Sequence, residues 1–210
     1  ASSSAASDVY KRQQNTALGA NALDANTTAN YNTAIGYNSL TANTTGANNT
    51  AVGREALYGN TTASNNTAVG YNAMNVNTTG ADNTAVGTNA LDANTTGSYN
   101  SAFGKHALTA STTADYNSAF GTTSLYSNTT GNYNTTVGAD SLKNNTTGAQ
   151  NTACGYGALN TSTTNSNVTA IGYRAMIYST GDGNTAVGAD ALRGSSSGSG
   201  GTGGLNVAIG

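Results

Sequence analysis

The sequence predicts an all-β fold, a parallel β-solenoid in which each coil is one copy of a 17-residue repeat. Glycine recurs every 17 residues from Gly19 to Gly172, then after 16 residues at Gly188 and after 22 at Gly210. Such a fixed period is typical of solenoids, in which each unit buries its apolar surface against its neighbours. Large apolar residues hold only two fixed places per repeat, too few for an amphipathic helix. Glycine, asparagine and β-branched threonine favour short strands between turns.

Numbered from its first asparagine, the repeat has the consensus N-[TS]-A-[VIF]-G-x-x-[AS]-L-x-x-N-T-T-[GA]-x-x, and we call these places positions 1 to 17. The triplet at positions 2 to 4 predicts one strand, and the threonine pair at positions 13 and 14 suits a second. Position 9 is leucine except at Met74 and Met176. Stacked coils repeat about every 4.8 Å, so the asparagines at positions 1 and 12 are expected to form amide ladders.

The large apolar residue at position 4 is expected to point into the coil, which turns alanine and glycine at positions 3 and 5 outward. Cys154 stands at position 4 and is expected to be a small buried hydrophobe. An outward strip of alanine and glycine would let a second chain approach closely, so it predicts a subunit contact. The alternative is that positions 3 and 5 line a tight corner.

Three segments carry a resemblance to a known family. "NTAVGYNAM" (Asn66 to Met74), "NTAIGYNSL" (Asn32 to Leu40) and "NVAIG" (Asn206 to Gly210) resemble the "NSVAIGxxS" repeat of YadA-type trimeric autotransporter adhesin heads. The resemblance covers roughly residues 15 to 210 and implies a left-handed parallel β-roll of three chains, displayed as an adhesive head. The unit here is longer, and threonine replaces the first valine of the motif except at Val207. Similar repeats are found in bacteriophage tail fibres.

The length of the repeat also permits a monomeric architecture. Three six-residue sides make an 18-residue triangular coil, so a three-sided β-helix with positions 4, 9 and 14 inward is the alternative to a trimeric β-roll. Threonine at position 14 counts against it, because a buried hydroxyl needs a partner.

Composition and charge exclude several kinds of partner. The net charge is −2 and no basic run exists, so nucleic acid is not expected as a partner. No apolar run approaches the roughly 20 residues that cross a bilayer, so this segment is not expected to insert into a membrane. The one histidine, His106, has no recurring thiol, histidine or carboxylate beside it. We therefore expect no metal site, no cofactor and no enzymatic activity.

The two ends depart from the repeat. Residues 1–14, "ASSSAASDVYKRQQ", form a non-repeat leader whose "SDVYKRQ" resembles a junction scar of translated environmental assemblies. Residues 15–210 form the repeat domain, which contains a Gly/Ser-rich loop at 193–205. No capping unit follows Ile209, so end-to-end association of the segment is expected.

Two sets of side chains are candidate sites. Tyrosines at positions 6 and 17 form partial aromatic columns that could contact a protein or a sugar, or could pack within the fibre. Asparagines at position 12 begin N-x-T sequons, which are candidate glycosylation sites, with a plain ladder as the alternative. The candidate contact residues are Tyr37, Tyr71, Tyr156, Tyr173, Tyr31, Tyr99, Tyr116 and Tyr133; the candidate glycosylation sites are Asn26, Asn43, Asn60, Asn77, Asn94, Asn128 and Asn145.

These observations predict a structural and adhesive fibre segment, an adhesin head or tail-fibre shaft. Its expected location is extracellular, on a cell or virion surface. The expected partners are other copies of the chain, as a homotrimer or a stacked filament, and a host-surface protein or glycan. The alternative is a purely structural extracellular filament that polymerises end to end and carries glycans on its sequons.

Overall fold

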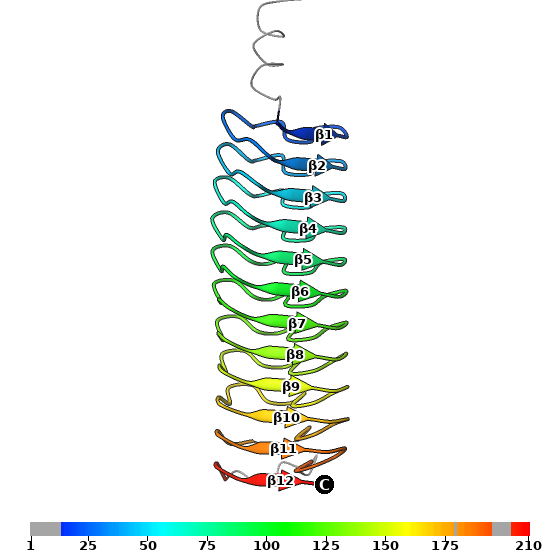
Figure 1. Ribbon diagram of the computed structural model, residues 1–210, viewed down its shortest axis with the longest axis vertical. Coiled ribbons are helices and arrows are strands. Elements are labelled where there is room, and N and C mark those ends of the chain that lie inside the picture. The colour runs from blue at the N-terminus through cyan, green and yellow to red at the C-terminus, as the bar shows by residue number, and fades with distance from the viewer. Residues whose placement is uncertain (1–13, 179, 195–202) are drawn as a thin grey trace, which may run out of the picture.

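The computed structural model describes residues 14–178, 180–194 and 203–210. The leader, except Gln14, and most of the Gly/Ser-rich loop predicted at 193–205 lie outside these ranges. The described residues form a single column of stacked coils with one three-residue strand per coil (Figure 1). The strands are β1 (Thr16–Leu18), β2 (Thr33–Ile35), β3 (Thr50–Val52), β4 (Thr67–Val69), β5 (Thr84–Val86), β6 (Ser101–Phe103), β7 (Ser118–Phe120), β8 (Thr135–Val137), β9 (Thr152–Cys154), β10 (Thr169–Ile171), β11 (Thr185–Val187) and β12 (Val207–Ile209).

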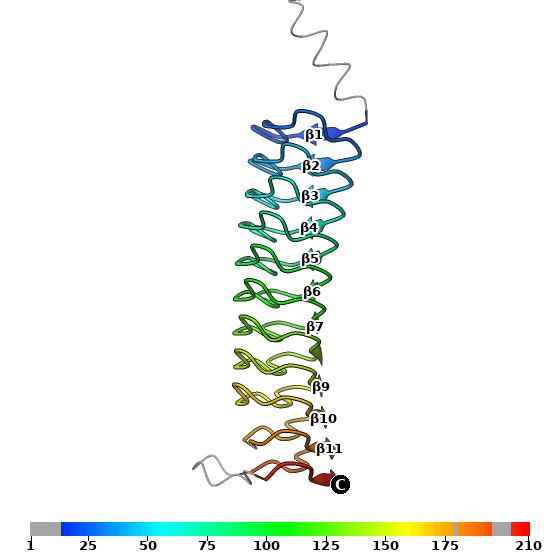
Figure 2. The same cartoon turned by 90° about the vertical axis from the view of Figure 1, so that its left-hand side faces the viewer.

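The twelve strands make one parallel sheet in sequence order, which confirms the predicted parallel β-solenoid and its strand at positions 2 to 4. Each strand pairs with the same positions of the next coil; Ala85 of β5, for example, lies opposite Ala102 of β6. Figure 2 shows the strands along one edge of the column and the turns along the other. The described residues contain no helix that could span a membrane. The threonine pair, expected as a second strand, forms a bend instead.

Glycine at position 5 turns the chain out of the strand. Its φ is between 127° and 139° in every coil from Gly19 to Gly188, a region that residues with a Cβ rarely enter. A Cβ on Gly70 would also lie 2.5 Å from the carbonyl oxygen of Gly87 in the next coil. Both constraints require glycine here, because the stacked corners leave no room for a side chain.

Three further positions per coil adopt left-handed backbone conformations without glycine. Asn72 and Met74 have φ values of 54° and 51°, and Tyr99 has 61°; they represent positions 7, 9 and 17. Such conformations are unfavourable for most residues. They persist here because the amides are bonded between coils: the N–H of Met74, for example, donates to the carbonyl of Ala90 at 3.0 Å.

The core of the column is narrow. The leucine or methionine of position 9 is buried in every coil from that of Leu23 to that of Met176 and meets small residues from positions 3 and 8. The predicted orientation of the strand is wrong. Ala85 at position 3 has no exposed surface, whereas Phe120 at position 4 is 41% exposed. Positions 2 and 4 therefore face outward, and the alanines predicted to form an outer strip lie inside the coil.

Two further predictions assumed that position 4 points inward, and both are wrong. A subunit contact through an Ala/Gly strip is excluded, because alanine at position 3 is not at the surface. The three-sided alternative placed positions 4, 9 and 14 inward, but only position 9 is there; Thr79, at position 14, is exposed. A 17-residue coil already filled by leucine leaves a narrow space beneath the strand, and position 3 fills it with alanine, or with threonine at Thr136.

The predicted amide ladders are present at positions 1 and 12. The backbone N–H of Asn83 donates to Oδ1 of Asn66 at 3.0 Å, and this contact recurs along position 1. At position 12, Nδ2 of Asn77 donates to Oδ1 of Asn60 at 2.9 Å. Nδ2 also bonds the carbonyl of Gly80 three residues on, at 2.9 Å. Each buried asparagine thus joins two coils and closes a turn of its own coil.

Candidate interaction surface

The outward residues of the strands form a face that runs the length of the column. We call positions 2 and 4 of β2 to β11 the outer sheet face. Position 2 supplies threonine or serine, and position 4 supplies Ile35, Val52, Val69, Val86, Phe103, Phe120, Val137, Cys154, Ile171 and Val187. The rings of Phe103 and Phe120 stack at a centroid distance of 4.9 Å with planes 6° apart. No charged residue stands at either position, so the face is a continuous apolar and hydroxyl surface.

Cys154 belongs to this face. Its side chain is partly exposed between Val137 and Ile171, so the prediction of a fully buried thiol is wrong. The cause is the same reversed orientation of the strand.

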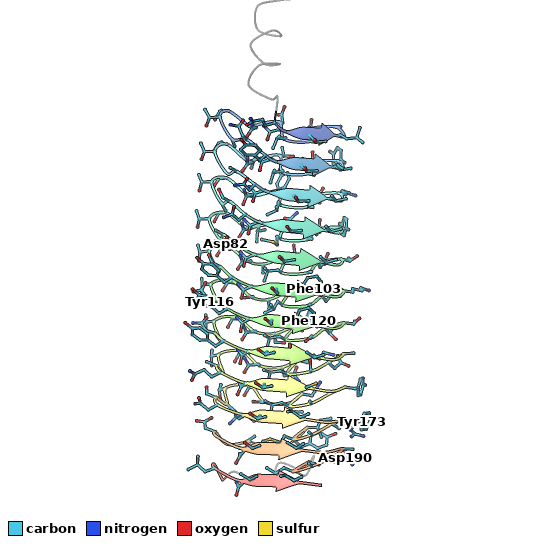
Figure 3. The ribbon with its side chains drawn as sticks, in the orientation of Figure 1. Asp82, Phe103, Tyr116, Phe120, Tyr173 and Asp190 are labelled. Carbon is cyan, nitrogen blue, oxygen red and sulfur yellow. The ribbon has the colours of Figure 1, made fainter. Side chains whose placement is uncertain are left out.

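Tyrosines flank the outer sheet face on both sides. We call positions 16 and 17, just before the asparagine that precedes each strand, the leading margin, and positions 6 and 7, directly after the glycine, the trailing margin. Figure 3 shows Tyr116 on one side of the column and Tyr173 on the other, with Phe103 and Phe120 between them. All eight candidate contact tyrosines are at least 45% exposed. The structure therefore separates them into two columns on opposite margins.

On the leading margin, three tyrosines form a continuous stack. The Tyr116 ring lies 4.7 Å from that of Tyr99 and 5.2 Å from that of Tyr133, with planes within 8°. Desolvation, the neighbouring tyrosines and Asp115 raise the pKa of Tyr116. Since each inner ring face is covered by another ring, a sugar could stack only on the two ends of this column. Ring edges and hydroxyls make up the surface that remains.

On the trailing margin, arginines interleave with the tyrosines. The guanidinium of Arg54 lies 5.8 Å from the Tyr37 ring centroid and 5.6 Å from that of Tyr71. Such cation–π contacts hold a long side chain in place. Arg54 also pairs with Glu55 at 3.2 Å. Farther along the column, Tyr156 and Tyr173 stack at 5.7 Å, and Arg174 lies over Tyr173.

The sequon asparagines lie inside the coil. Asn43, Asn60, Asn77, Asn94, Asn128 and Asn145 are completely buried. Their Nδ2 atoms, to which an N-linked glycan would attach, bond the carbonyl three residues on at 2.9–3.0 Å. A glycan on these atoms would displace those bonds, so their burial favours the plain ladder, the alternative to glycosylation, at these six residues. Asn26, in the first coil, is partly exposed and makes the same bond at 3.1 Å.

The position 12 ladder is interrupted where serine replaces asparagine. At Ser111 the shorter side chain does not reach its neighbour. The hydroxyl of Ser111 and Oδ1 of Asn94 are both buried without a hydrogen-bond partner. Oδ1 of Asn145 is in the same state below Ser162. These breaks mark the least satisfied points of the interior.

The interior also contains a cluster of buried hydroxyl groups that was not predicted from the sequence. Thr136 replaces alanine at position 3 of β8, and its Oγ1 lies 2.7 Å from Oγ of Ser124. The Ser124 hydroxyl lies 2.9 Å from that of Ser141, which donates to the carbonyl of Gly138. The signal was available: position 8 is serine rather than alanine in the two coils that Thr136 contacts. The cluster satisfies its own hydroxyls, so it is a packing feature.

Titratable groups are scattered over the turns. The described residues contain no group of three or more His, Cys, Asp or Glu side chains placed to hold a metal ion. His106 lies against Tyr126 with ring centroids 6.1 Å apart. Burial raises the pKa of Asp92, and the nearby His106 partly offsets this shift.

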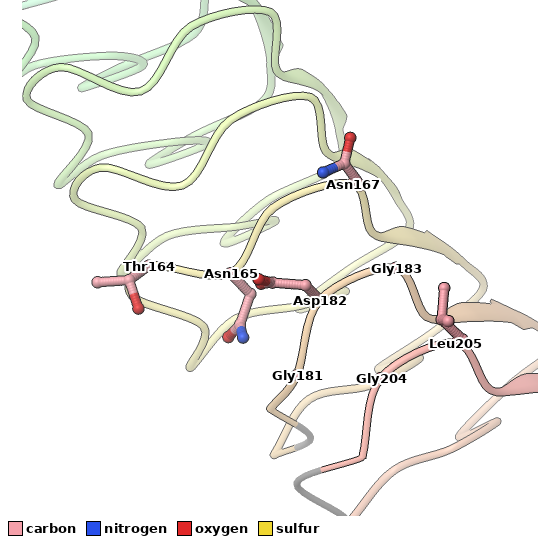
Figure 4. A pocket seen from close by; sticks show the side chains of 8 residues that line it. All are labelled: Thr164, Asn165, Asn167, Gly181, Asp182, Gly183, Gly204 and Leu205. Atoms are coloured by element: carbon pink, nitrogen blue, oxygen red, sulfur yellow. The ribbon is translucent and has the colours of Figure 1, made fainter.

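One hollow of about 770 Å³ lies beside the last coils (Figure 4). It is lined by Thr164, Asn165, Asn167, Gly181, Asp182, Gly183, Gly204 and Leu205. Oδ1 of Asp182 is engaged by the backbone N–H of Ser166 at 2.9 Å. The lining thus offers backbone, small polar groups and one hydrogen-bonded carboxylate.

No protein-family model matches the chain, and comparison with curated proteins and with solved structures finds no similar sequence or fold.

Proposed function

We propose that the chain is a structural and adhesive segment of a surface fibre, in which three copies pack through their outer sheet faces. The observation that carries this proposal is the outer sheet face itself. It presents valine, isoleucine and phenylalanine in successive coils without one charged side chain. Soluble proteins seldom leave so long an apolar surface uncovered. Full burial of an exposed valine-sized side chain contributes about 1.5–3 kcal/mol. The position 4 side chains are already partly covered, so each adds a fraction of this, and the face repeats that fraction coil after coil.

The resemblance to trimeric adhesin heads and tail-fibre shafts supports the number three and an extracellular location on a cell or virion. The left-handed β-roll belongs to the same proposal. A column of stacked coils suits a shaft because its length is set by the number of repeats. The subunit contact then lies on positions 2 and 4.

The assembly is tested by mass. Light scattering of the purified chain is expected to give three times the chain mass, and Val86→Asp is expected to reduce it to one. A carboxylate in an apolar contact opposes association because it must lose its water. Thr79→Asp, on the exposed threonine of position 14, is the matched control and leaves the mass unchanged. A single-chain mass for the unmodified protein would overturn the proposed assembly.

The adhesive role is assigned to the side of the column that assembly leaves free. Tyr58 and Tyr126, at position 10, are 43% and 37% exposed and belong neither to the outer sheet face nor to its margins. Tyrosine offers a large contact area at low entropic cost. We expect the assembled protein to bind a cell-surface protein or glycan, and Tyr58→Ser with Tyr126→Ser to weaken that binding without changing the mass.

The alternative function is a purely structural extracellular filament. Absence of binding to cells and to a glycan array, with the trimer intact, would favour it over the adhesive role. Its predicted glycan coat loses support, because the sequon side chains are buried in the folded coil.

A further inference from the structure

The two margins of the outer sheet face carry complementary sets of side chains. Before β6, β7 and β8 the leading margin holds a tyrosine, and after them the trailing margin holds Lys105, Thr122 and Ala139. Beside β4, β9 and β10 the order is reversed. There the leading margin holds Asn65, Gln150 and Asn167, and the trailing margin holds Tyr71, Tyr156 and Tyr173. Only β2 carries tyrosine on both sides, as Tyr31 and Tyr37.

Contacts within one chain do not explain this alternation. Tyr116 and Thr122 are separated by the whole of β7, and extended chain of this length spans roughly 20 Å. Tyr116 and Tyr173 also lie on opposite sides of the column in Figure 3. A tyrosine on one margin therefore cannot fill the space left by a small residue on the other margin of the same copy.

Charges differ between the margins in the same way. Positions 16 and 17 of the leading margin carry Asp82, Asp115 and Asp182 and no basic residue. Positions 6 and 7 of the trailing margin carry Arg54, Lys105 and Arg174, together with three acidic residues. Each of those acids already has a partner in its own chain: Glu55 pairs with Arg54, Asp140 with Lys143 and Asp190 with Arg193. Among the described residues, Lys105 and Arg174 form no ion pair.

We infer that the leading margin of one copy binds the trailing margin of the next copy, with the fibres parallel. The inference rests on the proposed packing of copies through their outer sheet faces. When copies are related by rotation about an axis along the fibre, opposite margins meet at the same height. Tyrosines of one copy then lie against short or amide side chains of the next. Antiparallel packing would instead bring each margin against itself, tyrosine stack on tyrosine stack and aspartates on aspartates.

Electrostatics favours the same pairing. Lys105 and Asp115 are in one coil, so parallel packing brings Lys105 of one copy toward Asp115 of the next. Arg174 and Asp182 share a later coil and are related in the same way. Opposite charges at a rim contribute mainly to orientation and to the rate of association. They therefore discriminate parallel from antiparallel copies more than they strengthen the contact.

Cysteine cross-linking tests the inference. In a Cys154→Ala background, Tyr116→Cys together with Thr122→Cys is expected to give reducible covalent oligomers on oxidation. Either single variant is expected to give none. Thr130→Cys with Thr122→Cys is the matched control: it also has two thiols, but Thr130, at the exposed position 14, belongs to neither margin and no oligomer is expected.

The oligomeric mass is measured on the same samples, so failure of the inference can be distinguished from failure of the proposed assembly. Cross-linking by Tyr116→Cys alone would show like margins in contact and overturn the inference. An oligomeric mass without cross-linking by the pair would also overturn it, while leaving the proposed assembly in place. A single-chain mass of the Cys154→Ala protein would overturn both.

A charge variant keeps the inference testable if the new thiols disturb packing. Lys105→Glu is expected to weaken association about tenfold at low salt and less at high salt, because exposed charges are screened. Lys105→Arg is the control and retains association. Equal association of both variants at low salt would contradict a contact between Lys105 and the acidic leading margin.

Discussion

Ala85 and Val86 are consecutive residues of β5, yet Ala85 is completely buried and Val86 is partly exposed on the outer sheet face. Ala85→Asp should therefore unfold the neighbouring coils, because an unpaired charge in the interior costs about 3–5 kcal/mol. Val86→Asp should leave the coil folded and affect assembly alone. Thermal melts followed by circular dichroism, compared between samples of the same oligomeric state, measure the difference in stability. Equal melting of the two variants would place both side chains on the same side of the sheet.

Repairing the asparagine ladder should stabilise the column. Ser111→Asn would supply a donor for the unpartnered Oδ1 of Asn94 and remove a buried unpaired hydroxyl. We expect a gain of about 1–2 kcal/mol in unfolding free energy, measured by denaturant titration. Asn77→Ala is the opposite case. It deletes the bonds to Asn60 and Gly80 and should destabilise the fold by about 1–3 kcal/mol. A loss of stability in Ser111→Asn would show that the wider ladder does not fit there.

The glycine corners should tolerate no side chain. Gly70→Ala places a Cβ 2.5 Å from a backbone oxygen of the next coil at a φ of 139°, and both effects are unfavourable. We expect several coils to lose their fold, seen as lost β signal in circular dichroism. Gly157→Asn is the matched control, since a Cβ there has nearest neighbours at 3.7 Å and other coils hold Asn38 or Asn72 at this position. Comparable damage from both variants would refute the role assigned to close backbone contact.

Asp92 is expected to destabilise the fold at neutral pH. Burial raises its folded-state pKa, so the folded carboxyl keeps its proton to a higher pH than the unfolded one, and stability falls as pH rises from about 4 through the raised value. In two other coils, position 10 is asparagine: Nδ2 of Asn75 donates to the carbonyl of Glu55 at 3.2 Å, and Nδ2 of Asn160 donates to that of Asp140 at 2.8 Å.

Asp92→Asn should supply the same hydrogen bond. The expected gain is about 1 kcal/mol at pH 7. Below pH 4 the gain should shrink, since a protonated carboxyl is itself neutral and can donate. Urea titrations of both proteins at pH 7 and pH 3.5 measure this difference. A gain that is the same at both pH values would rule out ionisation as the cause.

Labelling of Cys154 should report assembly. The thiol lies on the outer sheet face, so an alkylating reagent should reach it readily in separate chains and slowly where copies pack together. The Val86→Asp variant should therefore label faster than the unmodified protein. Equal rates in a sample of proven oligomeric mass would place the subunit contact on another face.

Much of the fold could be predicted from the repeat alone. The 17-residue period, the strand at positions 2 to 4, the buried residue at position 9 and the ladders of Asn66 and Asn77 all follow from residues that recur in register. Residues that pair with copies of themselves leave this signal in a single sequence.

The direction of the strand could not be obtained from size alone. Alternation establishes that Ala85 and Val86 face opposite ways, but it does not say which of them faces the interior. Leu91 and its equivalents fill the narrow coil from the other side, so small residues stand beneath the sheet, alanine in every coil except that of Thr136. The near constancy of alanine at position 3, beside varied residues at position 4, was the available clue. The complementarity of the two margins could not be predicted either. It emerges only when positions 6 and 17 are compared on either side of each strand, and this requires the strands to be located first.

The hydrogen bonds between coils lie along the axis of the column, as in the bond from Thr84 to Asn100 at 2.8 Å. A pull on the two ends of the column would thus load whole rows of these bonds directly. Each coil that gave way would release 17 residues, or roughly 60 Å of extended chain, in place of a rise of about 4.8 Å. Such a column would lengthen more than tenfold before its chain became taut, and it would absorb a sudden load one coil at a time.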